Sequence, residues 1–246
     1  MISEILRDIP WLPIDIDIDI VKLQQEYKFV CENYRFEDRQ PHVGRSLRPG
    51  KNCHADAWSG ISLISSDGSL YNDLRRGVGI SNKSDYLPTE LKNYCEYFYE
   101  LIDLFFVRNS KCRILRISPQ SSLAWHSHVF EHHQPEHVLT IQIPIEMPDD
   151  FEYCVVDKEE FTIASNANYD KWVPEERFAP PSRFKNIQRG KLDVGKAYYF
   201  NSYHFHNVFN YSDTYRASLV WYCNLKNKNF KQLIEKSLIK EGLWND

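Results

Sequence analysis

The chain has 246 residues, of which 42% are hydrophobic and 14% aromatic, and its formal net charge is −4. This length suits one large domain, or a core domain with an extension, and excludes a minimal disulfide-dependent fold. The small negative charge gives no broad electrostatic basis for binding nucleic acid. The aromatic content is typical of a β-rich protein and would suit an aromatic-lined pocket.

The N-terminal residues and the spacing of the cysteines favour a cytoplasmic protein. Glu4, Arg7 and Asp8 leave no apolar core for a signal peptide. The most apolar helix candidate, residues 101–107, is too short and too charged at its edges to cross a membrane. The six cysteines form no C-x-x-C pair, so neither a zinc ribbon nor a disulfide framework is expected. We therefore expect reduced thiols and no membrane or nucleic-acid partner.

The N-terminal part is expected to combine helices and strands. Strict alternation of Ile and Asp over residues 14–20 predicts a strand with Ile inward and Asp outward. Asp19 is placed to cap a helix over residues 21–33. A strand is predicted to begin at Trp58, and a second helix is predicted over residues 89–106, where apolar residues recur at helical spacing.

Strands dominate after Cys112, and a closing amphipathic helix is predicted over residues 230–240. A long Pro-rich connection over residues 166–189 is either a lid or a passive excursion. Eight short strands suit a mainly β protein with a double-stranded β-helix (jelly-roll, cupin-like) core. Residues 1–108 would form an extension packed on a core of residues 109–246, as one compact unit. The expected strands are 112–118, 123–129, 137–145, 151–156, 160–164, 190–200, 204–209 and 215–224.

Three histidines and one arginine stand out among the candidate site residues. In an extended strand, His126 and His128 would point to the same side, because residues i and i+2 share a face. His206 could add a third imidazole from a neighbouring strand. Arg216 lies ten residues beyond His206, at the start of an apolar run. A buried guanidinium needs an anionic partner, and its planar fork suits a carboxylate.

These segments resemble the Fe(II)/2-oxoglutarate-dependent dioxygenases. The stretch from Gly195 to Ser218, with His206 followed by Arg216, is similar to the family's C-terminal motif, in which a distal His ligand precedes an Arg on the next strand. The stretch from Arg113 to His126 resembles the strand and loop leading to the first His ligand. Within the superfamily, residues 90 to 225 are most similar to the aspartyl/asparaginyl β-hydroxylase-like branch and its phage and bacterial relatives.

The resemblance implies a site, a cofactor and a reaction. Iron(II) would be held by His126, His128 and His206, and 2-oxoglutarate would be the cosubstrate. Arg216 would pair with the distal carboxylate of 2-oxoglutarate, and Ser218, which shares the face of Arg216, could bond the same group. The enzyme would hydroxylate an unactivated C–H of an amino acid, a peptide or a protein side chain. Its partner would be a small-molecule or peptide substrate, possibly a protein.

The sequence departs from the family at the third iron ligand, which is usually an Asp or Glu two residues after the first His. Here that position is His128. Either His128 is the third ligand, or water takes its place in a two-His site, or Glu131 supplies a carboxylate from a bent strand end. His204 would share the face of His206 and is a rival ligand. We favour His206 because Arg216 then falls at the expected spacing.

A second departure concerns the substrate. The β-hydroxylase branch usually has another Arg on the strand after the first His motif, and residues 138–143 contain none. Loop arginines could grip a substrate carboxylate or could simply be solvated. An alternative is a cupin-like three-His metal protein, either a dioxygenase without 2-oxoglutarate or a binding module, which Arg216 and Ser218 oppose. Those loop arginines are Arg45, Arg48, Arg75 and Arg76, and three residues that could also face the pocket are Gln142, Tyr199 and Asn201.

Overall fold

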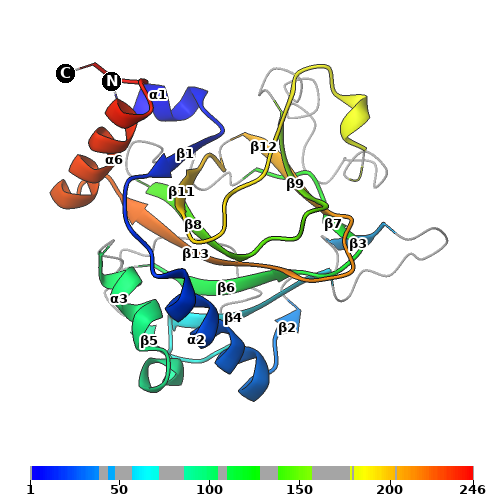
Figure 1. The fold of residues 1–246 in the computed structure, drawn as a ribbon, viewed down its shortest axis with the longest axis vertical. Coiled ribbons are helices and arrows are strands. Elements are labelled where there is room, and N and C mark those ends of the chain that lie inside the picture. Colours follow the sequence, from blue (N-terminus) through cyan, green and yellow to red (C-terminus); the bar gives the residue numbers. More distant parts are fainter. Residues whose placement is uncertain are drawn as a thin grey trace.

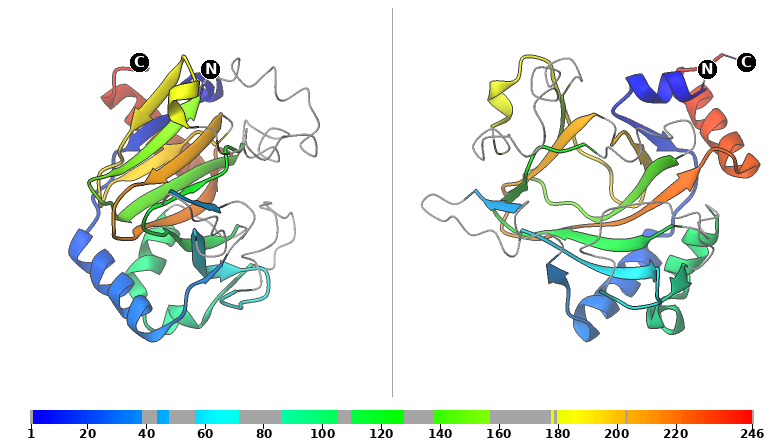
Figure 2. Two further views of the ribbon diagram at one scale, coloured as in Figure 1. Left: turned by 90° about the vertical axis from the view of Figure 1, so that its right-hand side faces the viewer. Right: turned by 180° about the vertical axis from the view of Figure 1, so that it is seen from behind.

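A computed structural model shows two antiparallel β-sheets facing each other, with helices gathered on one side (Figure 1). The structure describes residues 2–38, 44–47, 57–71, 86–104, 110–127, 138–156, 178, 180–202 and 204–245. Seen from behind, the two sheets enclose an interior between them (Figure 2). The expected mainly β fold is confirmed.

The larger sheet has eight strands in the order β1-β11-β8-β13-β6-β4-β2, with β5 paired to β4. The smaller sheet has five, in the order β10-β9-β12-β7-β3. The strands of the larger sheet are β1 (Trp11–Ile14), β2 (Glu37–Asp38), β4 (Trp58–Ser65), β5 (Leu87–Pro88), β6 (Cys112–Ile117), β8 (Val138–Glu146), β11 (Ala197–Phe200) and β13 (Arg216–Asn224). Those of the smaller sheet are β3 (Gly44–Ser46), β7 (Ser121–Leu123), β9 (Phe151–Val156), β10 (Ile187–Gly190) and β12 (Phe205–Asn210).

The strands β6 to β13 form a double-stranded β-helix. Their order within the larger sheet is β11-β8-β13-β6, and within the smaller sheet β10-β9-β12-β7. The chain therefore passes from one sheet to the other at nearly every connection, which is the winding of a jelly roll. The strands β1, β2 and β4 extend the larger sheet at its two edges, so parts of the first 108 residues belong to the same sheet as the core.

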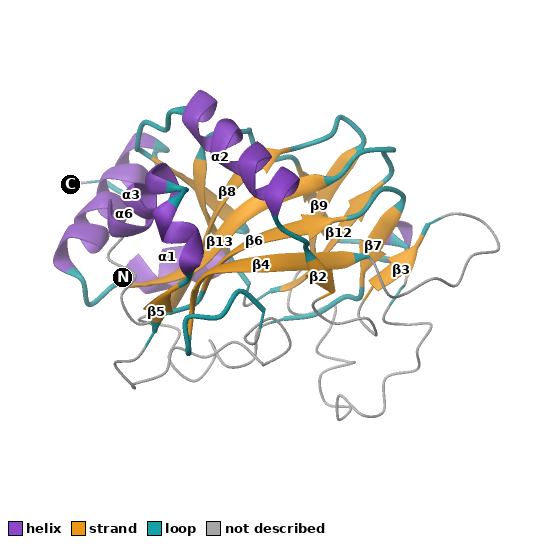
Figure 3. Cartoon of the chain, turned by 90° about the horizontal axis from the view of Figure 1, so that it is seen from below, coloured by secondary structure: helices purple, strands orange, loops and turns teal. Residues whose placement is uncertain are grey.

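Helices cover the outer face of the larger sheet (Figure 3). Side chains of α2, α3 and α6 form one apolar cluster with outward residues of β8 and β13, including Ile141, Ile143, Leu219 and Trp221. Asp19 caps α2, as predicted, by accepting hydrogen bonds from the backbone amides of Val21 and Lys22. The helices are α1 (Ile2–Asp8), α2 (Ile20–Asn33), α3 (Glu96–Leu104) and α6 (Lys228–Lys240), with 3-10 turns η2 (Glu90–Asn93) and η5 (Pro181–Arg183).

The alternation along the central strands separates two environments. In β13, Ala217, Leu219 and Trp221 join the helix-covered cluster. Val220, of opposite parity, belongs to a second cluster between the sheets with Leu115 of β6. Residues with the parity of Val220 therefore face the interior of the jelly roll. Arg216 and Ser218 therefore face the interior, as does Gln142 of β8, which pairs with Val220.

Four sequence-based expectations were wrong. The strand predicted over residues 123–129 lies earlier, at Ser121–Leu123, and residues 124–127 join the sheet only through the isolated bridge at His126. The strand predicted over residues 14–20 ends at Ile14, because its partner β11 pairs only as far as Ala197. The strand predicted over residues 190–200 is two strands in different sheets, β10 and β11. The helix predicted from residue 89 begins as the turn η2 and becomes α-helical only at Glu96. The predicted strand over 160–164 lies outside the described residues, as does most of the 166–189 connection.

The other expected strands and the closing helix are confirmed. The strands predicted near residues 58, 112, 137, 151, 204 and 215 and the closing helix are all present, with small shifts of their ends. The described cysteines are free thiols. Among the described residues no helix is both long enough and apolar enough to cross a membrane. The cytoplasmic location and the division of the chain at residue 108 stay predictions.

Candidate metal centre and anion site

His126 and His206 lie side by side at the end of the smaller sheet. They form an isolated antiparallel bridge, with His126 N donating to His206 O at 3.1 Å and His206 N donating to His126 O at 2.9 Å. Their ring centroids are 4.3 Å apart. Two residues separated by 80 positions in the sequence are thus held with their imidazoles adjacent, close enough to bind one metal ion.

Hydrogen bonds fix the tautomers of both rings. His126 Nδ1 lies 2.8 Å from the carbonyl oxygen of Ala124, and His206 Nδ1 lies 2.9 Å from that of His204. A carbonyl only accepts, so each neutral ring must donate from Nδ1 and carry its lone pair on Nε2. Metal-binding histidines are commonly oriented by such a bond from the other nitrogen. The pair is therefore prepared to present two Nε2 donors.

Aromatic side chains surround the pair from the opposite sheet. The Trp58 ring lies 6.1 Å from the His126 ring, and the Phe200 ring lies 5.1 Å from the His206 ring in an edge-to-face contact. His206 is only 6% exposed. The rival ligand, His204, instead directs Nε2 to the carbonyl oxygen of Arg7 at 2.6 Å. His206, not His204, is thus the histidine beside His126.

The third expected ligand cannot be placed. His128 and Glu131 both lie outside the described residues. Within the described ranges, no group of three His, Cys, Asp or Glu side chains could hold a metal. The choice between His128, water and Glu131 stays open.

Arg216 is buried at the start of β13 and points into the interior. It is 4% exposed, and Nη2 donates to Gln142 Oε1 at 2.8 Å. Gln142 Oε1 also accepts from the Tyr153 hydroxyl at 2.7 Å. Burial lowers the pKa of the Arg216 guanidinium to about 9. No carboxylate among the described residues forms a salt bridge with this guanidinium.

Polar groups at and near Arg216 lack hydrogen-bond partners among the described residues. Arg216 Nε and Ser218 Oγ are buried and form no hydrogen bond with any described residue. The guanidinium lies over the rings of Phe151 and Tyr153, at 5.4 and 5.1 Å from their centroids. Buried polar groups without partners are rare in native proteins because each pays its desolvation cost. The arrangement can accept an anion with at least two oxygen atoms.

Hydrogen bonds hold the β12–β13 connection that leads into Arg216. Asn210, fully buried at the end of β12, donates through Nδ2 to the carbonyl oxygens of Ser118 at 3.0 Å and Thr214 at 2.9 Å. This network ties the connection to the end of β6. A register shift between Ala217 and Ser218 follows at once against β8. Such bulges re-aim side chains at the edges of sites.

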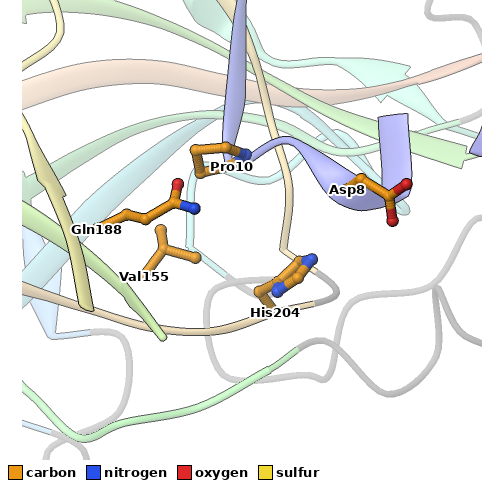
Figure 4. A pocket seen from close by; sticks show the side chains of 5 residues that line it. All are labelled: Asp8, Pro10, Val155, Gln188 and His204. Carbon is orange, nitrogen blue, oxygen red and sulfur yellow. The ribbon is translucent and has the colours of Figure 1, made fainter. Parts of the chain in front are cut away.

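A pocket of about 250 Å³ borders the smaller sheet near the histidine pair (Figure 4). Val155, which lines it, is the register partner of His206. The other lining residues are Asp8, Pro10, Gln188 and His204. This volume is below that of pockets for drug-sized molecules. It could take a small ligand or a single side chain.

The other residues that were expected to face the pocket differ in their orientation. Gln142 faces the interior and contacts Arg216. Tyr199 and Asn201 face the other way and bind the backbone carbonyl of Leu6 at 2.8 and 3.0 Å. Of the four loop arginines, Arg48, Arg75 and Arg76 and the side chain of Arg45 lie outside the described residues.

One interior arginine, Arg113 on β6, was not singled out as a site residue from the sequence. It is fully buried and faces the space between the sheets. Its position within a short apolar strand was a signal that could have identified it, because a guanidinium is rarely buried without a role.

Comparison with solved structures finds similar folds. The chain is similar to a 2OG-Fe(II) oxygenase family oxidoreductase from Burkholderia pseudomallei, with 12% identity, a TM-score of 0.46, and coverage of 90% of this chain and 88% of that one. It is also similar to a Trichoplax adhaerens prolyl hydroxylase bound to a peptide fragment of hypoxia inducible factor, with 10% identity, a TM-score of 0.45, and coverage of 94% and 90%.

A third similar structure is HygX from Streptomyces hygroscopicus with nickel and 2-oxoglutarate bound, with 11% identity, a TM-score of 0.47, and coverage of 87% of this chain and 82% of that one. No family model matches the sequence, and no curated protein matches it. At these identities and TM-scores, similarity of fold does not assign a function, which depends on the side chains that form the site.

Proposed function

We propose that this protein is a non-haem iron(II), 2-oxoglutarate-dependent oxygenase. The proposal is carried by one observation: a pair of histidines with Nε2 lone pairs and a buried guanidinium without a carboxylate partner among the described residues occupy the same jelly-roll interior. Imidazole is a suitable ligand for iron(II). The distal carboxylate of 2-oxoglutarate would supply the anion that the guanidinium lacks.

Each described residue has a distinct role in this proposal. His126 and His206 would hold the metal, and their Nδ1 bonds to backbone carbonyls would keep both rings in orientation. Arg216 would bind the distal carboxylate of 2-oxoglutarate, with Ser218 as a second donor. Gln142 would hold Arg216 in place in the absence of cosubstrate. Trp58 and Phe200 would keep water from the metal-binding face.

When bound, iron(II) would supply the oxygen chemistry that converts 2-oxoglutarate, dioxygen and a C–H group into succinate, carbon dioxide and an alcohol. We propose His128 as the third ligand. We further propose that the substrate is an amino acid, a peptide or a protein side chain, and that the chain is related to the aspartyl/asparaginyl β-hydroxylase-like branch. A cupin without 2-oxoglutarate has no requirement for Arg216 and Ser218, so their interior position favours the oxygenase.

Anaerobic titration with iron(II) and 2-oxoglutarate tests the proposal. A weak visible charge-transfer band is expected in the wild type. Arg216→Ala should bind iron as before but need at least about 30-fold more 2-oxoglutarate, since losing a buried charged pair costs on the order of 2–5 kcal/mol. His206→Ala should show no band at any concentration of 2-oxoglutarate.

Arg189→Ala is the matched control. Arg189 is also a strand arginine, but its side chain is 46% exposed and pairs at 3.6 Å with Glu152 at the surface. This variant should titrate like the wild type. Equal 2-oxoglutarate affinity in Arg216→Ala and the wild type would remove the cosubstrate assignment.

A further inference from the structure

Arg113 belongs to a row of interior residues that crosses the larger sheet. On β6 it pairs with Val220 of β13 and with Ser62 of β4, and Val220 pairs on its other side with Gln142 of β8. Leu115, two residues further along β6, lies in the cluster between the sheets. Arg113 therefore points into the same interior as the candidate site.

The side chain of Arg113 is fully buried and chemically unsatisfied. It has 0% exposure, and none of its three nitrogens, Nε, Nη1 and Nη2, has a hydrogen-bond partner within the described part of the chain. Ser62 Oγ, across the strand pair, is also buried without a described partner. A buried guanidinium with no acceptor is strongly unfavourable, so a fold that retains one points to an anion that is absent here.

This group is separate from the one that Arg216 offers. The Arg216 guanidinium reaches Gln142, whereas Arg113 lies on the far side of Val220. Two strand spacings separate the backbones of Gln142 and Arg113, which is roughly 10 Å. The interior thus has two buried cations in one layer, and one molecule of 2-oxoglutarate has only one distal carboxylate to neutralise them.

Arg113 also lies toward the end of the sheet at which the metal ligands enter. It is the second residue of β6, and its neighbours Cys112 and Trp221 pair near the start of β8. β8 starts at this end and β9 runs back toward it, and His206 pairs with Val155 near the end of β9. A molecule lying between the metal and this end of the interior would meet Arg113 and Ser62 before it met Arg216.

We propose that Arg113, assisted by Ser62, binds a carboxylate of the primary substrate, so that the substrate class is a small organic acid such as a free amino acid. This rests on the proposed oxygenase function. The planar guanidinium would form a bidentate pair with the carboxylate, and the Ser62 hydroxyl would donate a further hydrogen bond. The role of Arg113 is to orient the substrate, while Arg216 holds the cosubstrate.

The test measures acid-versus-amide discrimination. Consumption of 2-oxoglutarate by the iron-loaded enzyme is followed with a panel of L-amino acids and, in parallel, with their carboxamides. We expect one or more acids to stimulate consumption at least tenfold more than the matching amides. Arg113→Met should abolish that difference. Arg113→Lys should retain part of the difference between acids and amides, because lysine keeps the positive charge but lacks the paired donors of the planar guanidinium. Arg189→Met should behave like the wild type.

A second measurement needs neither iron nor turnover. Binding of acetate, with acetamide as the neutral comparison, is measured by ligand-detected NMR on protein saturated with 2-oxoglutarate. Acetate binding that weakens at least tenfold in Arg113→Met supports the site even if no oxygenase activity is found. Unchanged acetate binding in Arg113→Met, or a loss of 2-oxoglutarate binding in that variant instead, would overturn the proposal while leaving the assignment of Arg216 to be judged by its own titration.

Discussion

Replacing Arg216 with methionine should stabilise the ligand-free protein. The guanidinium is 4% exposed, and its only hydrogen bond to a described residue is the one to Gln142. Methionine has a similar length, no charge and a flexible shape that fills irregular gaps. The substitution therefore removes a poorly compensated buried charge without leaving a large cavity. Replacing buried ionic groups by apolar residues of similar volume is often stabilising.

The size of the effect follows from the environment of Arg216. Burial lowers the pKa of the guanidinium by more than three units from its usual value, to about 9. At about 1.4 kcal/mol for each pKa unit, the charged form costs about 5 kcal/mol in the folded state. The charge-assisted bond to Gln142 returns about 2 kcal/mol, and the contacts with the rings of Phe151 and Tyr153 return about 1 kcal/mol. A net stabilisation of about 2 kcal/mol is expected for Arg216→Met.

Urea denaturation at pH 7.5 without metal or cosubstrate measures this difference. Because the pKa of Arg216 is lowered on folding, the cost of burying the charge is fully present below pH 9 and shrinks as the pH rises above 9. Arg189→Met, at an exposed position, should change the free energy of unfolding by less than about 0.5 kcal/mol. If Arg216→Met unfolds at lower urea than the wild type, the guanidinium has an internal partner, and the argument for a missing anion fails.

Two further predictions concern a surface ion cluster and the third ligand. Hydrogen bonds from Lys236 and Lys240 lower the pKa of Asp15 from 3.8 to about 2, so the stabilisation from this carboxylate is present above pH 3.8 and lost as the pH falls through 2. Asp15→Asn should lower the melting temperature at pH 6, and its difference from the wild type should narrow below pH 4; a gap independent of pH would contradict this. His128→Ala should weaken iron(II) binding in equilibrium dialysis while His128→Asp retains it, and equal affinity in His128→Ala and the wild type would favour the two-His site.

Local patterns in the sequence account for much of the fold. The alternation in β8 and β13 and the capped helix α2 were predictable because they depend on residues close in the chain. The strand predicted from the Ile and Asp alternation after Ile14 does not form, and the reason lies outside that segment. A strand needs a partner, and the register of β1 with β11 ends at Ala197, near Gly195, whose φ of 74° turns the chain away.

Some features of the candidate site were likewise predictable from the sequence, and others depend on the tertiary structure. The sequence by itself determined that His206 and Arg216 are ten residues apart and that Arg216 and Ser218 share a face. Only the tertiary structure decided that His126 and His206, 80 positions apart, are hydrogen-bonded neighbours. Their pairing depends on the winding of the chain between two sheets, which no local pattern specifies.

Two arginines of β6 show most directly that the sequence does not determine which face of a strand becomes buried. Arg113 and Arg116 differ in parity, so the sequence alone requires only that they lie on opposite faces. The structure stacks Arg116 on the outside, with its guanidinium 3.7 Å from the ring centroid of Tyr215, and buries Arg113 between the sheets. Which face becomes the interior is decided by where the helices and the second sheet pack, because burial is a property of the assembled layers and not of the strand.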